Sequence, residues 1–124
     1  MRSNFPGFGG LLAAAAVAFA LAGPVAAADK LSGAQIKAAV AGNTVQGKME
    51  STGPYAEFYD KDGTIKGEGY TGKWAIDGDA MCFQYGSDPK MCWQVAKDGD
   101  TLQWVKDGKV DGTGTIAPGN PNKF

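Results

Sequence analysis

The sequence GKWAIDGDAMCFQYGSDPKMCWQVAKDGDTLQWVK, residues 72–106, contains three turn signals and both cysteines of the chain. Successive side chains of a β-strand point to opposite faces, so residues i and i+2 share a face. Met81 and Phe83 therefore share one face of a first expected strand. Met91 and Trp93 share one face of the next. This alternation predicts an antiparallel hairpin with one apolar face.

The two cysteines lie on the opposite face of the same two strands. Pairing Cys82 with Cys92 sets Phe83 opposite Met91, so that the apolar residues meet on a common face. We therefore predict a structural disulfide, which should stabilise the fold by about 2 to 3 kcal/mol. A redox-active pair is the alternative, but the spacing is not C-x-x-C and no neighbour is placed to lower a thiol pKa.

Glycine-containing turns flank this hairpin on both sides. A two-residue turn at Gly78-Asp79 would set Trp74 opposite Phe83. A two-residue turn at Asp98-Gly99 would set Trp93 opposite Trp104. Each predicted hairpin delivers its large apolar residues to one face.

A further loop is expected at residues 60–63, Asp-Lys-Asp-Gly. A four-residue loop there sets Phe58 opposite Ile65 on the apolar face. The same register sets Glu57 opposite Lys66 on the outer face, as a favourable cross-strand charge pair.

These hairpins extend into a larger meander. Asp107-Gly108 predicts a type I′ turn, and the whole pattern gives about eight short antiparallel strands. We predict a mainly all-β fold, an up-and-down meander curled into a small barrel, with an open sheet or sandwich as the alternative. One short helix is expected after Ser32, an N-cap with Gln35 at the capping-box position. It would cover one end or one open edge of the sheet.

The N-terminus predicts export. Arg2 precedes an apolar run at residues 11–22, and small residues follow up to Ala28. This is the layout of a signal peptide over residues 1–28, cleaved before Asp29, and the apolar run is shorter than the roughly 20 residues of a spanning helix. A single domain over residues 29–124 would remain, without a membrane span, in the periplasm or secreted.

Composition excludes several function classes. The chain has 12 Lys and Arg, 13 Asp and Glu, and no histidine. A weakly acidic chain whose one arginine lies in the leader lacks the basic footprint that nucleic acid demands. Without histidine there is no Ser-His-Asp or Cys-His apparatus, so we expect no catalytic residues, no cofactor and no enzyme activity. The segment 60–65 resembles part of an EF-hand loop, but Phe58 would fall at its first ligand position, so no metal site is expected.

Aromatic residues offer two interpretations. Trp74, Phe83, Trp93 and Trp104 could line a pocket, but a narrow barrel favours their packing as core. A second group, Tyr55, Tyr59 and Tyr70, is expected on the outer face or near loops, where it would form a surface for protein contacts.

The strand motifs also carry a resemblance. The runs F-Y-D-K-D-G-T-I-K-G, G-K-W-A-I, M-C-F and M-C-W resemble small exported bacterial proteins of unknown function with a G-x-W strand and a two-cysteine hairpin. A more distant resemblance is to bacterial inhibitors of C-type lysozymes, which are small exported β-barrels with disulfides. The first resemblance implies no chemistry, and the second implies inhibition of a cell-wall lytic enzyme.

Three functions follow as hypotheses. The first is a non-enzymatic exported module that binds an envelope protein or a small apolar ligand. The alternative is an inhibitor of a lytic enzyme such as lysozyme. A carboxylate-based hydrolase ranks last, because the acidic residues lie mostly in turns. The oligomeric state is left open by the sequence.

Overall fold

The fold is known from a computed structural model that describes residues 28–124. The predicted signal peptide, residues 1–28, lies outside the described residues except for Ala28. The described chain begins with a two-residue strand, β1 (Asp29–Lys30), and one helix, α2 (Gly33–Val40). The other elements are strands in chain order: β2 (Asn43–Met49), β3 (Gly53–Tyr59), β4 (Thr64–Gly67), β5 (Tyr70–Asp77), β6 (Ala80–Gln84), β7 (Met91–Asp98), β8 (Thr101–Lys106) and β9 (Lys109–Pro118).

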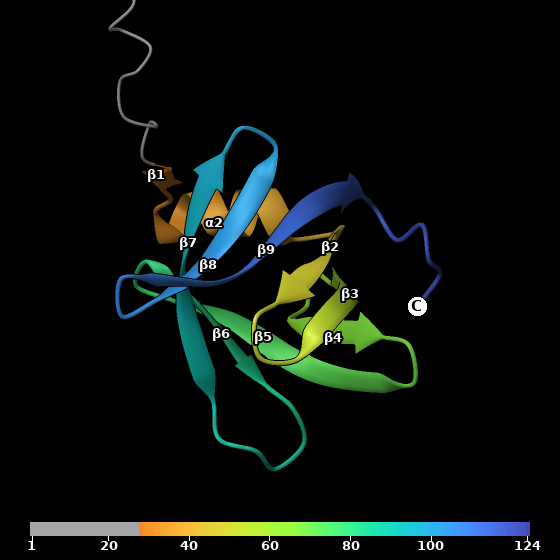
Figure 1. Ribbon diagram of the computed structural model, residues 1–124. Coiled ribbons are helices and arrows are strands. Elements are labelled where there is room, and N and C mark those ends of the chain that lie inside the picture. The colour runs from red at the N-terminus through yellow and green to blue at the C-terminus, as the bar shows by residue number, and fades with distance from the viewer. Residues whose placement is uncertain (1–27) are drawn as a thin grey trace, which may run out of the picture.

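Strands β2 to β9 form a closed antiparallel barrel of eight strands (Figure 1). Each strand pairs with its neighbours in the chain, and β9 pairs with β2 to close the ring. The predicted up-and-down meander is therefore confirmed, and it forms a barrel rather than an open sheet or a sandwich. Closure removes the free strand edges that an open sheet would expose.

The central hairpins have the predicted registers. Trp74 lies opposite Phe83 in the β5–β6 ladder. In the β6–β7 ladder, Phe83 lies opposite Met91 and Cys82 lies opposite Cys92. The two cysteines form a disulfide, as predicted.

The predicted register of β7 with β8 is wrong by two residues. Trp104 lies opposite Val95, not Trp93, because the two-residue turn is Gly99-Asp100 rather than Asp98-Gly99. Gly99 has a φ of 63°, and glycine takes such a φ at the first turn position more readily than aspartate. A shift of two residues keeps every side chain on its predicted face.

The predicted register of β3 with β4 is wrong by one residue, which reverses the faces of β3. Ile65 lies opposite Tyr59, and Lys66 lies opposite Phe58. The loop is shorter than expected because the Asp60 amide already donates to the Thr64 carbonyl at 2.8 Å. Residues 61–63 form the turn, and Gly63 takes a φ of 95°. Three-residue hairpin loops commonly end in such a left-handed glycine.

Helix α2 covers one end of the barrel and lies behind β8 and β9 in the upper half of Figure 1. The predicted capping box is present, because Ser32 and Gln35 exchange side-chain and backbone hydrogen bonds. Ile36 and Val40 are fully buried in the hydrophobic core. A Cβ at Gly33 would lie 2.1 Å from the Gly78 carbonyl oxygen, so only glycine allows the helix to approach the β5–β6 turn this closely. Within residues 28–124 no helix is long and apolar enough to cross a membrane.

Candidate functional site

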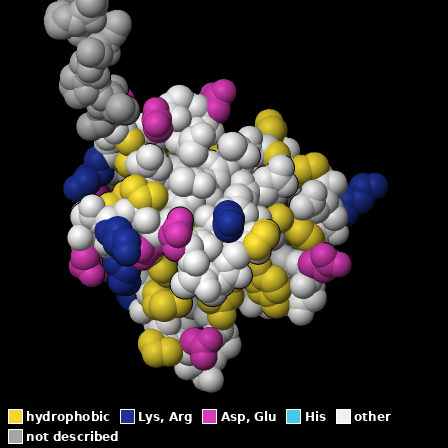
Figure 2. Space-filling view, in the orientation of Figure 1, with side chains coloured by type: hydrophobic (Ala, Val, Ile, Leu, Met, Phe, Trp, Pro, Cys, Tyr) yellow, Lys and Arg dark blue, Asp and Glu magenta, His cyan; other side chains and the backbone are white. Residues whose placement is uncertain are grey.

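A cavity of about 470 Å³ opens at the end of the barrel opposite α2. Figure 2 shows hydrophobic side chains gathered on the lower half of the molecule, where Figure 1 places the β6–β7 loop. Thirteen residues line the cavity: Met49, Ser51, Thr52, Pro54, Tyr55, Glu57, Tyr59, Tyr70, Phe83, Tyr85, Met91, Trp93 and Trp104. Glu57 is the only acidic residue in this set, and no lysine or arginine belongs to it.

Strand β3 supplies one wall of the cavity through its alternation. Tyr55, Glu57 and Tyr59 lie at every second position, so they share one face of the strand. Because the β3–β4 loop sets Tyr59 opposite the buried Ile65, that shared face is the barrel interior. Glu57 is consequently only 7% exposed, although it carries a carboxylate.

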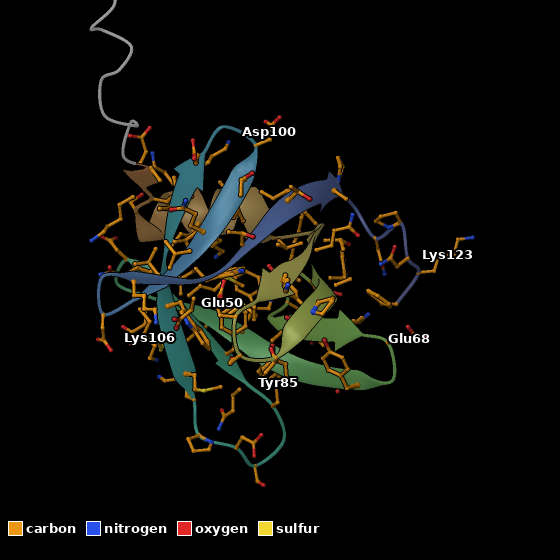
Figure 3. The ribbon with its side chains drawn as sticks, in the orientation of Figure 1. Glu50, Glu68, Tyr85, Asp100, Lys106 and Lys123 are labelled. Atoms are coloured by element: carbon orange, nitrogen blue, oxygen red, sulfur yellow. A yellow bond between two sulfur atoms is a disulfide. The ribbon has the colours of Figure 1, made fainter. Side chains whose placement is uncertain are left out.

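Three tyrosine hydroxyls donate to the Glu57 carboxylate. Tyr59 donates to Oε1 at 2.8 Å, and Tyr70 donates to Oε2 at 2.7 Å. Tyr85, labelled in Figure 3, lies 3.1 Å from Oε1 and 2.9 Å from Oε2. Both oxygens therefore have hydrogen-bond partners, as a buried polar group requires.

The negative charge of Glu57 has no cationic partner among the described residues. In that part of the chain the one salt bridge joins Lys66 to Asp60, and neither residue lines the cavity. A buried carboxylate is usually paired with a cation, because transfer from water to a less polar interior is unfavourable. Here three neutral O–H donors stand in place of that cation.

All four tyrosines of the chain have raised phenol pKa values. Burial raises the pKa of Tyr55 to about 12, although the hydrogen bond from Trp104 partly offsets the effect. Burial, followed by the nearby Glu57 carboxylate, also raises the pKa of Tyr59, Tyr70 and Tyr85 well above the ordinary phenol value. Tyr59, Tyr70 and Tyr85 therefore stay protonated, as donors to Glu57, beyond the pH at which an ordinary phenol ionises.

Glycines on neighbouring strands make room for two of these rings. A Cβ at Gly67 would lie 2.3 Å from Cζ of Tyr70, and a Cβ at Gly72 would lie 2.7 Å from the Tyr85 ring. Real Cβ atoms do not approach other atoms so closely. Each ring can therefore occupy its place only because the neighbouring residue is glycine and has no side chain. Gly67 and Gly72 thus help to position two of the three donors to Glu57.

Phe83 is the centre of the aromatic wall. Its ring packs edge to face against Tyr59 at 6.0 Å, and against Trp93 and Trp104 at 5.5 Å each. Such geometry is favourable because the positive edge of one ring meets the negative face of another. The expectation that these aromatic residues only fill the interior is therefore wrong in part, since Phe83, Trp93 and Trp104 also line the cavity.

The N–H groups of both cavity tryptophans are already hydrogen-bonded. Trp104 donates to the Tyr55 hydroxyl at 2.7 Å, which in turn donates to the Thr113 carbonyl at 2.9 Å. Trp93 donates to Oδ2 of Asp111 at 3.2 Å. What these residues offer to the cavity is mainly ring surface.

The sequence-predicted site residues meet different outcomes. Tyr59 is only 1% exposed, and Tyr55 and Tyr70 line the cavity, so the expected outer tyrosine surface does not form. For Tyr55 and Tyr59 the prediction failed because it relied on the wrong face of β3. Tyr70 is still 42% exposed at the rim.

Cys82 and Cys92 form the predicted disulfide in the β6–β7 hairpin, and their strand neighbours Phe83 and Met91 line the cavity.

Sequence reasoning missed Glu57 and Tyr85. The alternation Tyr-x-Glu-x-Tyr at residues 55–59 contained a signal, because it puts two long amphipathic rings on the same face as the carboxylate. That signal could be used only after the β3–β4 loop length was known.

The EF-hand-like segment forms the β3–β4 turn. The side chains of Asp60 and Asp62 accept hydrogen bonds from backbone amides of this loop. Among the described residues no group of three or more His, Cys, Asp or Glu side chains could hold a metal ion.

Comparison with protein-family models, with curated proteins and with solved structures finds no match to this chain.

Proposed function

We propose that this chain is a non-enzymatic, exported binding module that holds a small, largely apolar ligand in the open end of its barrel. The observation that carries the proposal is a concave, aromatic-lined cavity of about 470 Å³ at an end that α2 does not cover. Ligand sites are commonly clefts of 300 to 1,000 Å³ with mostly apolar walls and a few placed polar groups, and the mouths of β-barrels are frequent locations.

A binding role fits the cavity better than a hydrolytic one. Acid–base hydrolysis by carboxylates usually needs two of them, and Glu57 is the only carboxylate among the lining residues. Its oxygens are engaged by tyrosines, which leaves no second group placed to activate water. The absence of histidine from the sequence removes the commonest other general base.

Export is part of the same proposal. The disulfide supports it, because such bonds persist in oxidising compartments. The signal-peptide pattern of residues 1–28 gives independent support. Expression of the full chain in a bacterium, followed by mass measurement of the periplasmic product, should give a chain that begins at Asp29. A product with its leader intact would contradict export.

The binding proposal is tested by a fragment screen followed by nuclear magnetic resonance. We expect small apolar fragments to shift the amide signals of residues at the open end, including Met91 and Trp93, and to leave the α2 end unchanged. Met91→Ala should weaken binding, because this side chain lines the cavity and is 43% exposed. Val110→Ala is the matched control, since Val110 is 39% exposed and does not line the cavity. No fragment binding, or shifts scattered over the surface, would contradict the proposal.

The alternative function, inhibition of a lytic enzyme, stays a prediction. Its test is the activity of a lysozyme panel in the presence of the mature protein, and full activity of every enzyme would count against it.

A further inference from the structure

We infer that the cavity selects ligands bearing a small organic cation, such as a quaternary or tertiary ammonium group, which would lie against the aromatic walls near Glu57. This inference rests on the proposed binding function and adds the chemical class of the ligand. Three independent features of the cavity support it: its charge, its lack of free donors and the surfaces of its rings.

Charge is the first feature. Glu57 is the only acidic residue in the lining, and no lysine or arginine belongs to the lining. The residues described contain no salt-bridge partner for Glu57. An uncompensated negative charge in a partly desolvated pocket attracts cations more strongly than a surface charge does, because water screens it less. The same charge repels anionic ligands.

The second feature is that the polar atoms of the cavity rings are already used within the protein. The hydroxyls of Tyr59, Tyr70 and Tyr85 donate to Glu57. The Trp93 N–H donates to Asp111, and the Trp104 N–H donates to the Tyr55 hydroxyl. A carboxylate or phosphate ligand would need free donors, and among the side chains of the lining only the hydroxyls of the turn residues Ser51 and Thr52 are left for a ligand.

The third feature is the aromatic wall itself. The face of an aromatic ring carries partial negative charge, and desolvated cages of such rings recognise quaternary ammonium groups. The protein already uses this attraction at the outer side of the site: the Lys106 ammonium lies 4.9 Å from the centre of the Trp93 ring. Lys106 itself does not line the cavity. A ligand cation inside would meet the same ring chemistry together with the Glu57 charge.

The test compares two ligands of equal shape. Choline and 3,3-dimethylbutan-1-ol differ in one respect, because a carbon atom replaces the charged nitrogen. We expect the mature protein to bind choline about tenfold more tightly, as cation–π attraction in a desolvated site implies. Tryptophan fluorescence and amide shifts at the open end provide the readouts. Benzyltrimethylammonium, which adds one ring to the same head group, serves as a larger probe.

Glu57→Gln is the decisive variant. It removes the charge and keeps a similar shape, so the preference for choline should fall to about threefold or less, while affinity for 3,3-dimethylbutan-1-ol stays unchanged. Glu68→Gln is the matched control. It removes the same charge from the tip of the β4–β5 turn, where Figure 3 shows Glu68, outside the cavity lining. That variant should keep the full preference. If Glu57→Gln does not fold, Trp93→Leu replaces it, because a smaller apolar side chain should weaken choline binding more than binding of the neutral alcohol.

The outcomes separate this inference from the proposed function. Equal affinity for the two ligands, or an undiminished choline preference in Glu57→Gln, would overturn the cation inference and leave the binding function in place. Failure of the cations, of the alcohol and of all apolar fragments to bind would overturn both. Choline binding that depends on Glu57 but not on Glu68 would support both.

Discussion

Tyr85 bridges the two carboxylate oxygens of Glu57 with a single hydroxyl, at 3.1 and 2.9 Å, across 28 positions of the sequence. Tyr85 follows directly after β6, whereas Glu57 lies within β3. These strands are not neighbours in the barrel, so the bond spans its interior. The network thereby joins two walls of the cavity, and it should contribute both to stability and to the shape of the site.

The first prediction concerns the three phenol donors. Tyr59→Phe should lower the free energy of unfolding by about 1.5 to 3 kcal/mol, because it removes a buried hydrogen bond to a charged group. Tyr70→Phe should lower the free energy of unfolding by less than Tyr59→Phe does, since Tyr70 is 42% exposed and water can take the place of its hydroxyl. Urea unfolding monitored by circular dichroism measures both changes.

A double-mutant cycle provides the control for this prediction. In the Glu57→Gln background, Tyr59→Phe should lower the free energy of unfolding by clearly less than it does in the native protein, because the two residues are in direct contact. Strict additivity of the two changes would show that the Tyr59 hydroxyl does not stabilise the protein through Glu57.

A second prediction concerns alkaline pH. All four phenol pKa values are raised, that of Tyr55 to about 12 and the others well above the ordinary phenol value. No tyrosine of the folded protein should therefore ionise near pH 10, the ordinary phenol value. Because the folded pKa lies above the unfolded one, the related stability is fully present below about pH 10 and is lost as the pH rises through the folded values.

The near-ultraviolet absorbance of tyrosinate measures this behaviour directly. The native protein should show no step near pH 10, and the reduced chain in concentrated urea should ionise all its tyrosines there. A native step near pH 10 of even one tyrosine would contradict the described burial, and the corresponding Tyr→Phe variant would identify which residue titrates.

The sequence predicts the central hairpins well because their signals are local and redundant. Two-residue turns and the pairing of Cys82 with Cys92 fix the β5–β6 and β6–β7 registers independently, and both agree with the structure. The barrel and the capped helix follow from the same kind of signal. Where one turn was misplaced by two residues, at Gly99-Asp100, the faces were still correct.

The candidate site could not be predicted in the same way, because it depends on one loop length. Residues 60–63 offer both a three-residue and a four-residue turn. The choice decides whether Phe58 or Tyr59 points inward, and with it the place of Glu57. A buried carboxylate contradicts simple hydrophobic patterning, so the pattern favours the wrong face. Only the tyrosine donors from other strands make the inward position favourable, and those contacts are not visible in the local sequence.

A third prediction concerns the glycine beneath Tyr70. In Gly67→Ala the new methyl group would overlap the Tyr70 ring, so the ring must move and its hydrogen bond to Glu57 should break. We expect a loss of stability close to that of Tyr70→Phe, together with a shifted Tyr70 ring signal in the nuclear magnetic resonance spectrum.

Tyr70→Ala supplies the matched background for this prediction. Without the ring the added methyl group has room, so Gly67→Ala should then leave stability unchanged or raise it slightly, since alanine restricts the unfolded chain more than glycine does. An equal loss in both backgrounds would place the effect in the β4 backbone and not in the tyrosine.

The last prediction concerns the disulfide beside the cavity. Cys82→Ala combined with Cys92→Ala should lower the free energy of unfolding by about 2 to 3 kcal/mol, because the short closed loop then gains freedom in the unfolded state. Reduction of the native protein should cause a similar loss, whereas the double variant should be insensitive to reductant. Cavity binding should weaken in parallel, because Phe83 and Met91 lie next to the two cysteines and line the cavity. Unfolding that reductant does not affect would show that the bond between Cys82 and Cys92 does not stabilise the hairpin.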